Sequence, residues 1–201
     1  MQSPATDTDV RAYQLLDDGT ELFLRPIEPR DRGLVERGFE ELSRDSRYQR
    51  FFTFRDALSA QELRALTESD GDHALALGLV SYDDEGNARP LGVARYVRLT
   101  SEPEVAEAAV TVVDAMHGRG LGKLLLRQLV RAARARGIER LRGEVLTTNR
   151  AMQRLLRGFD PPAQPLRREP GSQEYELRLA EPTTAPPCAP SDTRAAGTMP
   201  A

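Results

Sequence analysis

Hydrophobic and polar positions alternate along this chain with two different periods. Apolar residues at every second position predict a half-buried β-strand, whereas apolar residues three and four positions apart predict an amphipathic helix. The first period predicts seven strands, at residues 13–16, 21–25, 73–82, 91–99, 104–113, 141–146 and 173–179. The second predicts five helices, which begin near Asp31, Ser43, Ser59, Leu121 and Asn149. These elements predict an α/β (α+β) fold, with a twisted sheet of about six to seven strands and flanking helices.

The loops between these elements predict how the strands are connected. Asp17, Asp18 and Gly19 form a turn signal that joins the first two strands as a hairpin. The three middle strands are separated by short polar loops, which predicts an antiparallel meander. A long helix then joins the last strand of this meander to the next strand, and such a unit predicts a parallel pair with a right-handed crossover. The sheet is therefore expected to be mixed and mostly antiparallel, with one βαβ unit.

Three glycines at alternate positions, Gly118, Gly120 and Gly122, lie between the strand and the helix of this βαβ unit. Glycine permits positive φ angles and lets the backbone come close to a bound group. The helix N-terminus that follows offers unpaired N–H groups and the positive end of the helix dipole. The segment is therefore predicted to bind an anion.

Two common phosphate-binding motifs do not fit these glycines. A dinucleotide fingerprint requires G-x-G-x-x-G in the first βαβ unit of the chain, whereas the spacing here is G-x-G-x-G after antiparallel strands. A P-loop requires G-x-x-x-x-G-K-[ST]. In this sequence His117 occupies the first glycine position and Leu124 occupies the hydroxyl position. The residues exclude both motifs.

The glycine segment instead resembles the acyl-CoA pyrophosphate loop of the GNAT superfamily of N-acetyltransferases, whose pattern is Q/R-x-x-G-x-G/A. Gly120 and Gly122 match its glycines, and His117 stands where Gln or Arg is usual. The resemblance extends over residues 22–159 and includes the segments LRPIEPRD, SRDSRYQRFF and GEVLTTNRAMQRLL. These segments are similar to a bacterial subgroup that includes protein lysine acetyltransferases of the Pat type. The resemblance implies the GNAT fold and an acyltransferase that moves an acetyl group from acetyl-CoA, its cosubstrate, to an amine.

The resemblance also implies which residues bind acetyl-CoA. The loop amides bind the pyrophosphate, and the side chains of Arg119 and Lys123 are candidates to add positive charge. The strand before the loop parts from its neighbour and offers free backbone groups to the pantetheine arm. Asn149 begins the family motif N-x-x-M-x-x-L, contacts the same arm and is also a candidate N-cap. The predicted acetyl-CoA site comprises Val112, Val113, His117, Gly118, Arg119, Gly120, Leu121, Gly122, Lys123 and Asn149.

Glu107 is the candidate catalytic residue, as the general base. It lies on the strand before the loop, among alanines and valines, where a carboxylate is expected to face a cleft. Proteins of the Pat type carry their catalytic glutamate in a similar A-E-x-A setting. Glu104 and Glu144 are competing carboxylates, and a solvated position for Glu107 at the rim of the strand is the alternative.

The sequence departs from the family pattern at Leu156. Many GNAT enzymes have a tyrosine seven positions after the motif asparagine, where it protonates the departing thiolate. The departure favours one rival function, an acyl-CoA-binding sensor with little or no turnover. The amine acceptor is also open, with a protein lysine favoured over a small amine by the subgroup resemblance. Another rival is an interaction module that uses the arginines and aromatic residues of 44–54, although Phe51 and Phe52 are expected to be core residues.

Composition narrows the class of protein. The chain has 201 residues, 39% hydrophobic and 29% charged, and a formal net charge of −3, which is typical of a globular protein and not of a nucleic-acid binder. No signal peptide or membrane span is evident, so a cytoplasmic location is expected. The histidines lack a metal-binding motif and Cys188 is the single cysteine, so neither a metal site nor a disulfide is expected. Residues 1–10 are predicted to be flexible, 11–180 to form the acetyltransferase domain, and 181–201 to be disordered. No feature predicts the oligomeric state.

Overall fold

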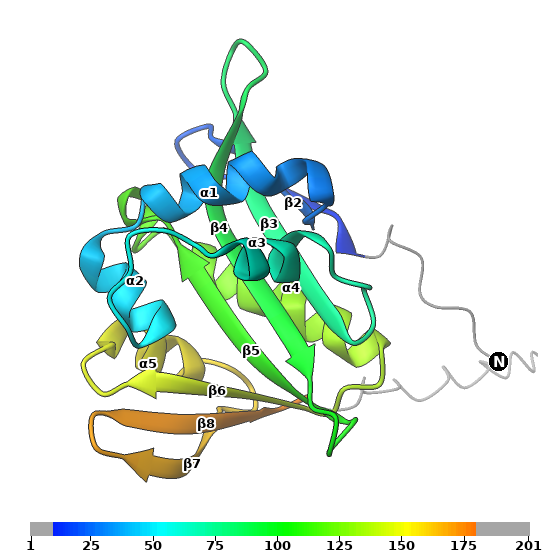
Figure 1. Ribbon diagram of the computed structural model, residues 1–201, viewed down its shortest axis with the longest axis vertical. Coiled ribbons are helices and arrows are strands. Elements are labelled where there is room, and N and C mark those ends of the chain that lie inside the picture. The colour runs from blue at the N-terminus through cyan, green and yellow to red at the C-terminus, as the bar shows by residue number, and fades with distance from the viewer. Residues whose placement is uncertain (1–9, 180–201) are drawn as a thin grey trace, which may run out of the picture.

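The computed structural model describes residues 10–179, which form an eight-stranded sheet with helices on both faces (Figure 1). The strands are β1 (Ala12–Leu15), β2 (Glu21–Pro26), β3 (Ala74–Tyr82), β4 (Ala88–Arg98), β5 (Val105–Val112), β6 (Arg140–Leu146), β7 (Gln164–Glu169) and β8 (Ser172–Arg178). Their order in the sheet is β1-β2-β3-β4-β5-β6-β8-β7, and β5 with β6 is the parallel pair. The predicted mixed, mostly antiparallel sheet is confirmed. The predicted flexible and disordered termini lie outside the described residues, except for Val10, which is buried.

The predicted number of strands was too low, because β7 was not predicted. All six residues of β7 are exposed, and its sequence, QPLRRE, has no alternation of apolar and polar positions. The strand lies at the edge of the sheet and pairs with β8 alone, so neither of its faces needs apolar residues. A pattern of burial cannot reveal a strand that is not buried.

The five predicted helices are α1 (Arg32–Glu40), α2 (Arg44–Phe51), α3 (Ala60–Thr67), α4 (Leu121–Ala135) and α5 (Arg150–Arg157). Two short 3-10 helices, η2 (Pro29–Asp31) and η3 (Asp114–Met116), precede α1 and the glycine loop. At the start of α3, Ser59 and Glu62 form a reciprocal capping box. Helix α2 ends earlier than the expected 43–54 segment because Phe52 adopts a left-handed conformation at its C-cap, with φ 57°.

The aromatic residues around α2 pack against arginines, and Phe51 also packs against the buried Phe39, with 5.8 Å between the ring centroids. Phe52 is exposed, so its predicted core position is wrong. The guanidinium groups of Arg50 and Arg55 lie 4.9 and 4.4 Å from the centroid of the Phe51 ring. Arg47 lies 4.5 Å above Phe39 in the same way. These cation–π contacts occur within the chain itself, so the mixture of arginines and aromatic rings has a structural role.

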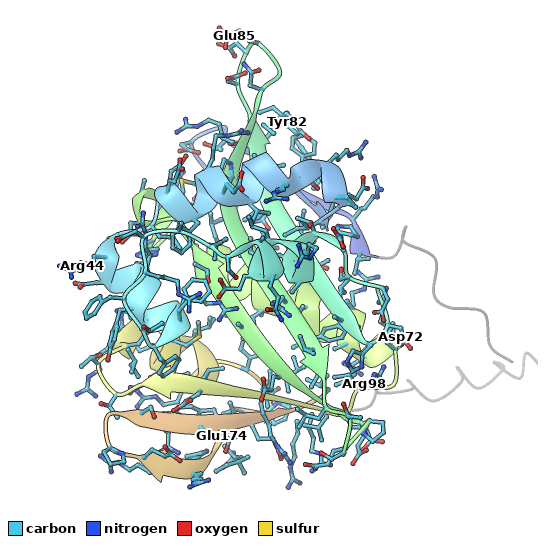
Figure 2. The ribbon with its side chains drawn as sticks, viewed as in Figure 1. Arg44, Asp72, Tyr82, Glu85, Arg98 and Glu174 are labelled. Atoms are coloured by element: carbon cyan, nitrogen blue, oxygen red, sulfur yellow. The ribbon has the colours of Figure 1, made fainter. Side chains whose placement is uncertain are left out.

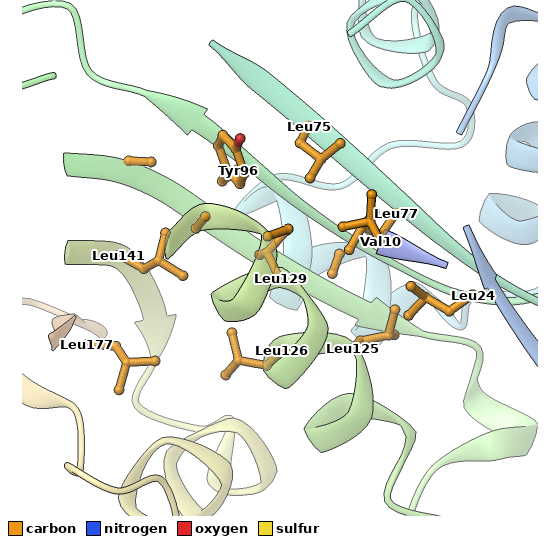
Figure 3. Close-up of a cluster of buried hydrophobic side chains, with 14 of the residues drawn as sticks. Val10, Leu24, Leu75, Leu77, Tyr96, Leu125, Leu126, Leu129, Leu141 and Leu177 are labelled. Atoms are coloured by element: carbon orange, nitrogen blue, oxygen red, sulfur yellow. The ribbon is translucent and has the colours of Figure 1, made fainter. Parts of the chain in front are cut away.

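Helix α4 is the centre of the main hydrophobic core (Figure 3). Its buried stripe comprises Leu121, Leu125, Leu126, Leu129, Ala132 and Ala133. The stripe packs on β4 around Ala94 and Tyr96, which are fully buried. The Tyr96 hydroxyl donates to the carbonyl of Asp72 at 3.2 Å, and burial raises the pKa of Tyr96 to about 12. Helix α5 contributes Met152, Leu155 and Leu156 to the same core, whereas α1 and α3 cover the other face of the sheet over a smaller cluster around Ile27 and Leu63.

Helix α4 can approach the sheet closely because β4 has a glycine beneath it. A Cβ atom at Gly92 would lie 2.7 Å from the carbonyl oxygen of Thr111 and 2.9 Å from Leu125 Cδ1. Both distances are shorter than a normal van der Waals contact of a Cβ atom with a non-bonded atom. Any larger residue at this position has to displace either β5 or α4.

We expect Gly92→Ala to lower the free energy of unfolding by about 1–3 kcal/mol, because the added methyl group overpacks the contact between β4 and α4. Chemical denaturation measures this change. Gly33→Ala is the matched control. Gly33 lies in α1, where a Cβ meets only the Arg37 guanidinium at 3.7 Å, so the control is expected to be neutral or stabilising by up to about 1 kcal/mol. Equal effects in the two variants would contradict the close approach at Gly92.

Candidate active site

The cleft that carries the predicted site opens where β5 and β6 part. Their parallel pairing covers three residue pairs, Val105 to Glu107 opposite Arg140 to Arg142. Beyond Glu107 the two strands diverge, and a cleft of about 1110 Å³ extends from the N-terminus of α4 and helix α5 past β5 to α2, β7 and β8. This volume is enough for a large cosubstrate together with a small acceptor.

The edge of β5 that faces this cleft carries backbone groups without a neighbouring strand. The Val113 N–H donates to Leu91 on the β4 side at 3.0 Å. Because successive residues of a strand direct their backbone groups to opposite sides, those of Val112 and Val110 point toward β6. The Val112 carbonyl lies 2.9 Å from His117 Nε2. Within the described pairing of β5 and β6, Val110 has no partner on this side, so its N–H and carbonyl are available to a ligand.

The glycine loop places the start of α4 at one end of the cleft. Gly118 and Gly120 have φ angles of 76° and 81°, which favour glycine, and Gly120 is the N-cap of α4. A Cβ at either glycine would meet nothing within 4 Å, so a ligand can reach the loop backbone. A helix N-terminus with a glycine cap and no side-chain cap presents its first N–H groups to an anion.

The predicted acetyl-CoA residues do not all face the cleft. Eight of them line it: Val112, His117, Gly118, Gly120, Leu121, Gly122, Lys123 and Asn149. Val113 is buried and does not line this cleft, and its N–H is already bonded to Leu91. The Arg119 guanidinium forms an ion pair with Asp18 in the turn between β1 and β2. The structure therefore gives Val113 and Arg119 structural contacts in place of a position on the cleft.

Asn149 is the N-cap of α5 and also lines the cleft. Its Oδ1 atom accepts a hydrogen bond from the Met152 N–H at 3.0 Å. The buried Gln153 holds the same turn, because its Nε2 atom donates to the carbonyls of Leu146 and Thr147 at 3.3 and 3.0 Å. The cap occupies the oxygen of Asn149, so its amide nitrogen is the group that can contact a ligand.

Glu107 lies at the fork itself, as the last residue of β5 that is paired with β6. Its carboxylate is exposed to the cleft, and no hydrogen bond or ion pair with the described residues engages it. Arg142, the residue directly opposite on β6, is bonded instead to Glu102 at 2.8 Å and Glu176 at 3.0 Å. These two acids raise the pKa of Arg142 above its ordinary value. The carboxylate of Glu107 therefore faces the cleft without a bonded partner among residues 10–179.

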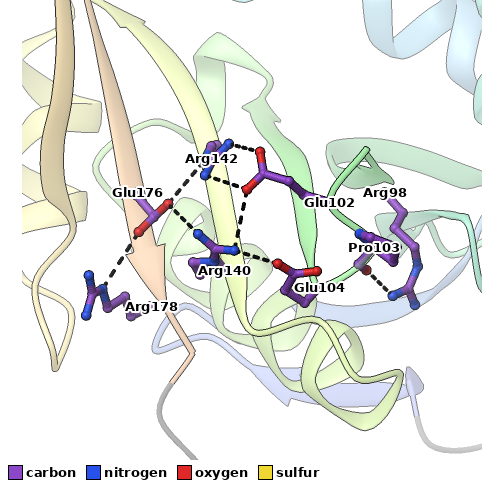
Figure 4. Close-up of polar contacts among 8 residues, drawn as sticks. All are labelled: Arg98, Glu102, Pro103, Glu104, Arg140, Arg142, Glu176 and Arg178. Atoms are coloured by element: carbon purple, nitrogen blue, oxygen red, sulfur yellow. Dashed lines mark hydrogen bonds and ion pairs between the residues drawn. The ribbon is translucent and has the colours of Figure 1, made fainter. Parts of the chain in front are cut away.

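The two competing carboxylates are both engaged. Glu104 pairs with Arg140 at 2.7 Å, outside the cleft, in the ion-pair ladder that joins the loop after β4 to β6 and β8 (Figure 4). Glu144 lines the cleft and accepts a hydrogen bond from the Ser172 hydroxyl. Glu107 thus differs from both in position and in having no bonded partner.

A family model described as the acetyltransferase (GNAT) family matches residues 36–159. The chain belongs to the GNAT acetyltransferase family. It is 31% identical to Acetyltransferase PA5475 of Pseudomonas aeruginosa over 140 residues. The aligned region covers 70% of this chain and 74% of that protein. It is 35% identical to Acetyltransferase Pat of Mycolicibacterium smegmatis over 140 residues. The aligned region covers 69% of this chain and 40% of that relative, so the chain spans less than half of the relative's length.

Solved structures agree with this assignment. The GNAT domain of S. lividans PAT superimposes with a TM-score of 0.76 at 29% identity, over 87% of this chain and 99% of that chain. A cAMP-binding acyltransferase from Mycobacterium smegmatis gives a TM-score of 0.57 at 25% identity, over 90% of this chain and 50% of that chain. The predicted family and GNAT fold are confirmed, and the chain is an acyltransferase whose family implies acetyl-CoA as cosubstrate.

Two further observations concern residues 10–179. In this range no group of three or more His, Cys, Asp or Glu side chains is placed to hold a metal ion. No helix there is long and apolar enough to cross a membrane.

Five arginines that the sequence patterns did not indicate line the cleft of this GNAT domain: Arg50 on α2, Arg95 on β4, Arg142 on β6, Arg154 on α5 and Arg167 on β7. Arg95 interrupts an otherwise apolar strand, LGVARYVRL, and a charge at such a position is a usable signal. Arg50 and Arg154 occur in helices that contain several arginines, and the sequence does not distinguish the one that faces the cleft.

Helix α2 is attached to the segment that leads into the glycine loop. Asp114, the first residue of η3, accepts hydrogen bonds from the Ser43 N–H at 2.9 Å, the Ser43 hydroxyl at 2.6 Å and the Ser46 hydroxyl at 2.9 Å. Partial burial opposes ionisation of Asp114, but the hydrogen bonds from Ser43 and Ser46 prevail and hold its pKa below the ordinary value. The N-terminus of α2 therefore depends on an ionised carboxylate next to the loop.

We expect Asp114→Ala to lower the free energy of unfolding at pH 7 by about 1–3 kcal/mol, because three hydrogen bonds to a charged group are lost. Since the folded-state pKa is depressed, this stabilisation is present above the unfolded-state pKa of about 3.9 and is lost as the pH falls through the lower folded-state value. Denaturation at pH 7 and at pH values below 4 measures both effects. Asp84→Ala, in the exposed turn after β3, is the control and is expected within about 0.5 kcal/mol of the wild type. A difference between the two variants that persists unchanged in acid would contradict the role of the Asp114 charge.

Proposed function

We propose that this chain transfers an acetyl group from acetyl-CoA to an amine, with Glu107 as general base. One observation carries the proposal: β5 and β6 part at Glu107, within the same cleft that the glycine loop enters at the N-terminus of α4. An anion site, a free strand edge and an unpaired carboxylate therefore follow one another along a single cleft. The order matches the parts that the reaction needs, which are a phosphate anchor, a guide for the pantetheine arm and a proton acceptor.

In this proposal the chain holds the cosubstrate through three sets of contacts. The first N–H groups of α4, together with those of Gly118 and Gly120, bind the pyrophosphate, and Lys123 adds positive charge. The free backbone groups of Val110 bind the pantetheine arm as an added strand would, and the amide nitrogen of Asn149 contacts it from the other side. Acetyl-CoA supplies the activated acyl group as a thioester.

Glu107 accepts a proton from the ammonium form of the acceptor, because only the neutral amine has the lone pair that attacks. The amine nitrogen then bonds to the thioester carbonyl carbon and the carbon–sulfur bond breaks. The second proton that the nitrogen loses as it becomes an amide goes to the leaving thiolate, directly or through water. A backbone N–H at the β5 edge stabilises the developing oxyanion. The acceptor of this proposal is a protein lysine by the subgroup resemblance, with a small amine as the alternative. The reaction is proposed to take place in the cytoplasm.

A second candidate function, an acyl-CoA sensor with little turnover, is favoured by Leu156. This residue is buried on α5 and brings no hydroxyl to the place where many relatives carry a tyrosine. Against this interpretation, Tyr175 of β8 also lines the described cleft, so a phenol is present on another element. Turnover with a suitable amine separates the two functions.

We expect acetyl-CoA at about 100 times its Kd to raise the melting temperature by about 5–10 °C. Gly122→Leu should abolish this shift, because Gly122 lies in the first turn of α4 and its Cβ would point toward Leu155 at 3.6 Å, inside the cleft. Gly33→Leu is the matched control, since Gly33 holds the same position in the first turn of α1, away from the cleft. A wild-type protein that acetyl-CoA does not stabilise would exclude both the enzyme and the sensor.

We expect Glu107→Gln to lower the acetylation rate at neutral pH by about 10²-fold or more, because the amide cannot accept the ammonium proton. The shift in melting temperature with acetyl-CoA should be unchanged. Release of free thiol, measured with lysine peptides and with small amines, gives the rate. Glu144→Gln is the comparison, because Glu144 is the other candidate carboxylate in the cleft. If Glu144→Gln were inactive and Glu107→Gln fully active, the role of base would belong to Glu144.

A further inference from the structure

Two cleft-lining arginines near Glu107 form no hydrogen bond or ion pair with the described residues. Arg50 comes from the last turn of α2 and Arg95 from the middle of β4. Both line the large cleft and also the small apolar pocket of about 80 Å³ between α1, α3 and the sheet. They therefore stand at the junction of the two spaces, and residues 10–179 provide neither a hydrogen bond nor an ion pair for either guanidinium.

Among the other arginines around α2, Arg47 and Arg55 are bonded to the chain, and Arg44 is exposed to water. Arg47 donates to the carbonyl of Glu40 at 3.0 Å, and Arg55 pairs with Glu62. Arg44 lies over the Phe54 ring, 4.7 Å from its centroid, at the outer edge of α2 (Figure 2). Arg50 has only the face of the Phe51 ring, which cannot satisfy its N–H donors.

The surroundings of the pair favour an anion. Burial lowers the pKa of Arg50 to about 10, and the positive charges of Arg95 and Arg55 lower it further. Burial likewise lowers the pKa of Arg95, and the charge of Glu107 opposes this shift. Two like charges that are partly removed from water are unfavourable unless an opposite charge joins them. Glu107 and Glu62 act on this pair from a distance, but neither forms an ion pair with it. A ligand with an opposite charge in direct contact would therefore stabilise both guanidinium groups.

The register of the sheet places this charge next to the reaction centre. Arg95 lies directly opposite Ala109 on β5, and Glu107 lies directly opposite Val97. Arg95 and Glu107 are therefore diagonal neighbours on one face of adjacent strands, a spacing of roughly 7–8 Å. Small residues, Ala109 and Thr111, line the junction from β5 and leave room above them.

We propose that Arg50 and Arg95 bind a carboxylate of the reacting molecules, within a few bonds of the carbon–nitrogen bond that forms. The inference rests on the proposed function, since it places this carboxylate relative to Glu107. Guanidinium groups bind planar carboxylates through paired, charge-assisted hydrogen bonds. The carboxylate has two chemical sources: the amine acceptor, as in an amino acid, or the acyl chain, as in the thioester of a dicarboxylic acid.

Two comparisons distinguish these sources. In the first, acetyl-CoA is the donor, and the standard amino acids and Nα-acetyl-lysine are compared with their neutral C-terminal amides. In the second, succinyl-CoA is compared with butyryl-CoA, which has the same chain length without the charge, and the amides serve as acceptors. For each pair of compounds we compare kcat/KM and the shift in melting temperature that each compound produces. CoA is present when the acceptors are tested. Binding therefore decides the matter even where turnover is absent.

We expect the carboxylate-bearing partner in one of the comparisons to be favoured about 10- to 100-fold, the factor that corresponds to one or two charge-assisted hydrogen bonds. Arg50→Gln and Arg95→Gln should each reduce this preference to about twofold or less. Arg50→Lys and Arg95→Lys, which keep the charge without the paired donors, should retain part of it and show that the fold tolerates substitution. Arg44→Gln and Arg89→Gln, at exposed positions on α2 and β4, are the matched controls and should keep the full preference.

The absence of any preference in both comparisons, or a preference that survives in either glutamine variant, would overturn the proposal. This result is distinct from failure of the proposed function. Stabilisation by acetyl-CoA tests the glycine loop, which lies apart from Arg50 and Arg95, and it is expected to be normal in all of these variants. An enzyme that acetylates neutral amines with no preference for a carboxylate would retain the proposed function and lose only the carboxylate site.

Discussion

The short parallel pairing of β5 with β6 is the constraint on which the rest of the site depends. The two strands are held together at one end by the ion-pair ladder of Figure 4, in which Arg140 and Arg142 of β6 bind Glu102 and Glu104 of the loop before β5. At the point of divergence Gly143 permits a close approach, because a Cβ there would lie 3.0 Å from the Ala108 carbonyl. Beyond it the strands separate, and the backbone of β5 becomes a free edge that lines the cleft. Its unpaired N–H and C=O groups need a partner, which is either water or a ligand, so the fork offers a ligand a ready-made edge to bind.

The same ladder decides which charges remain available in the cleft. It engages Arg142, the nearest arginine of β6 to Glu107, and Asp18 engages Arg119 of the loop. Among residues 10–179, the unengaged charges along the cleft follow an order: cationic groups at the start of α4, the carboxylate of Glu107 at the fork, and the guanidinium groups of Arg50 and Arg95 beyond it. Arg154 of α5 is a further unengaged charge on the cleft. A ligand with phosphates at one end and a carboxylate near the reacting amine complements this order.

The sequence predicts those parts of the molecule in which a local pattern reflects burial or backbone conformation. The apolar stripe of α4, the glycine loop and the parallel crossover all follow from the spacing of residues along the chain. In each case the residues act on the segment in which they lie. The acidic position at Glu107 follows from one charged residue in an apolar strand. By contrast, β7 has no buried face. The ion pair that holds Arg119 away from the cleft joins residues about a hundred positions apart. Whether Arg50 has a partner depends on which of its neighbours are already engaged. These features arise from tertiary contacts, which a pattern along one chain does not record.

The cosubstrate loop and the proposed carboxylate site share one mechanical attachment. Asp114 opens η3, three residues before His117, and it also binds Ser43 and Ser46 at the start of α2. The same helix carries Arg50 in its last turn, where Phe52 ends it abruptly with a left-handed residue. A helix of eight residues is too short to be stable alone, so its position is set by contacts at its ends. Asp114 therefore fixes the segment before the glycine loop and the helix that carries Arg50 to each other, so the positions of both ends of the cleft depend on one carboxylate.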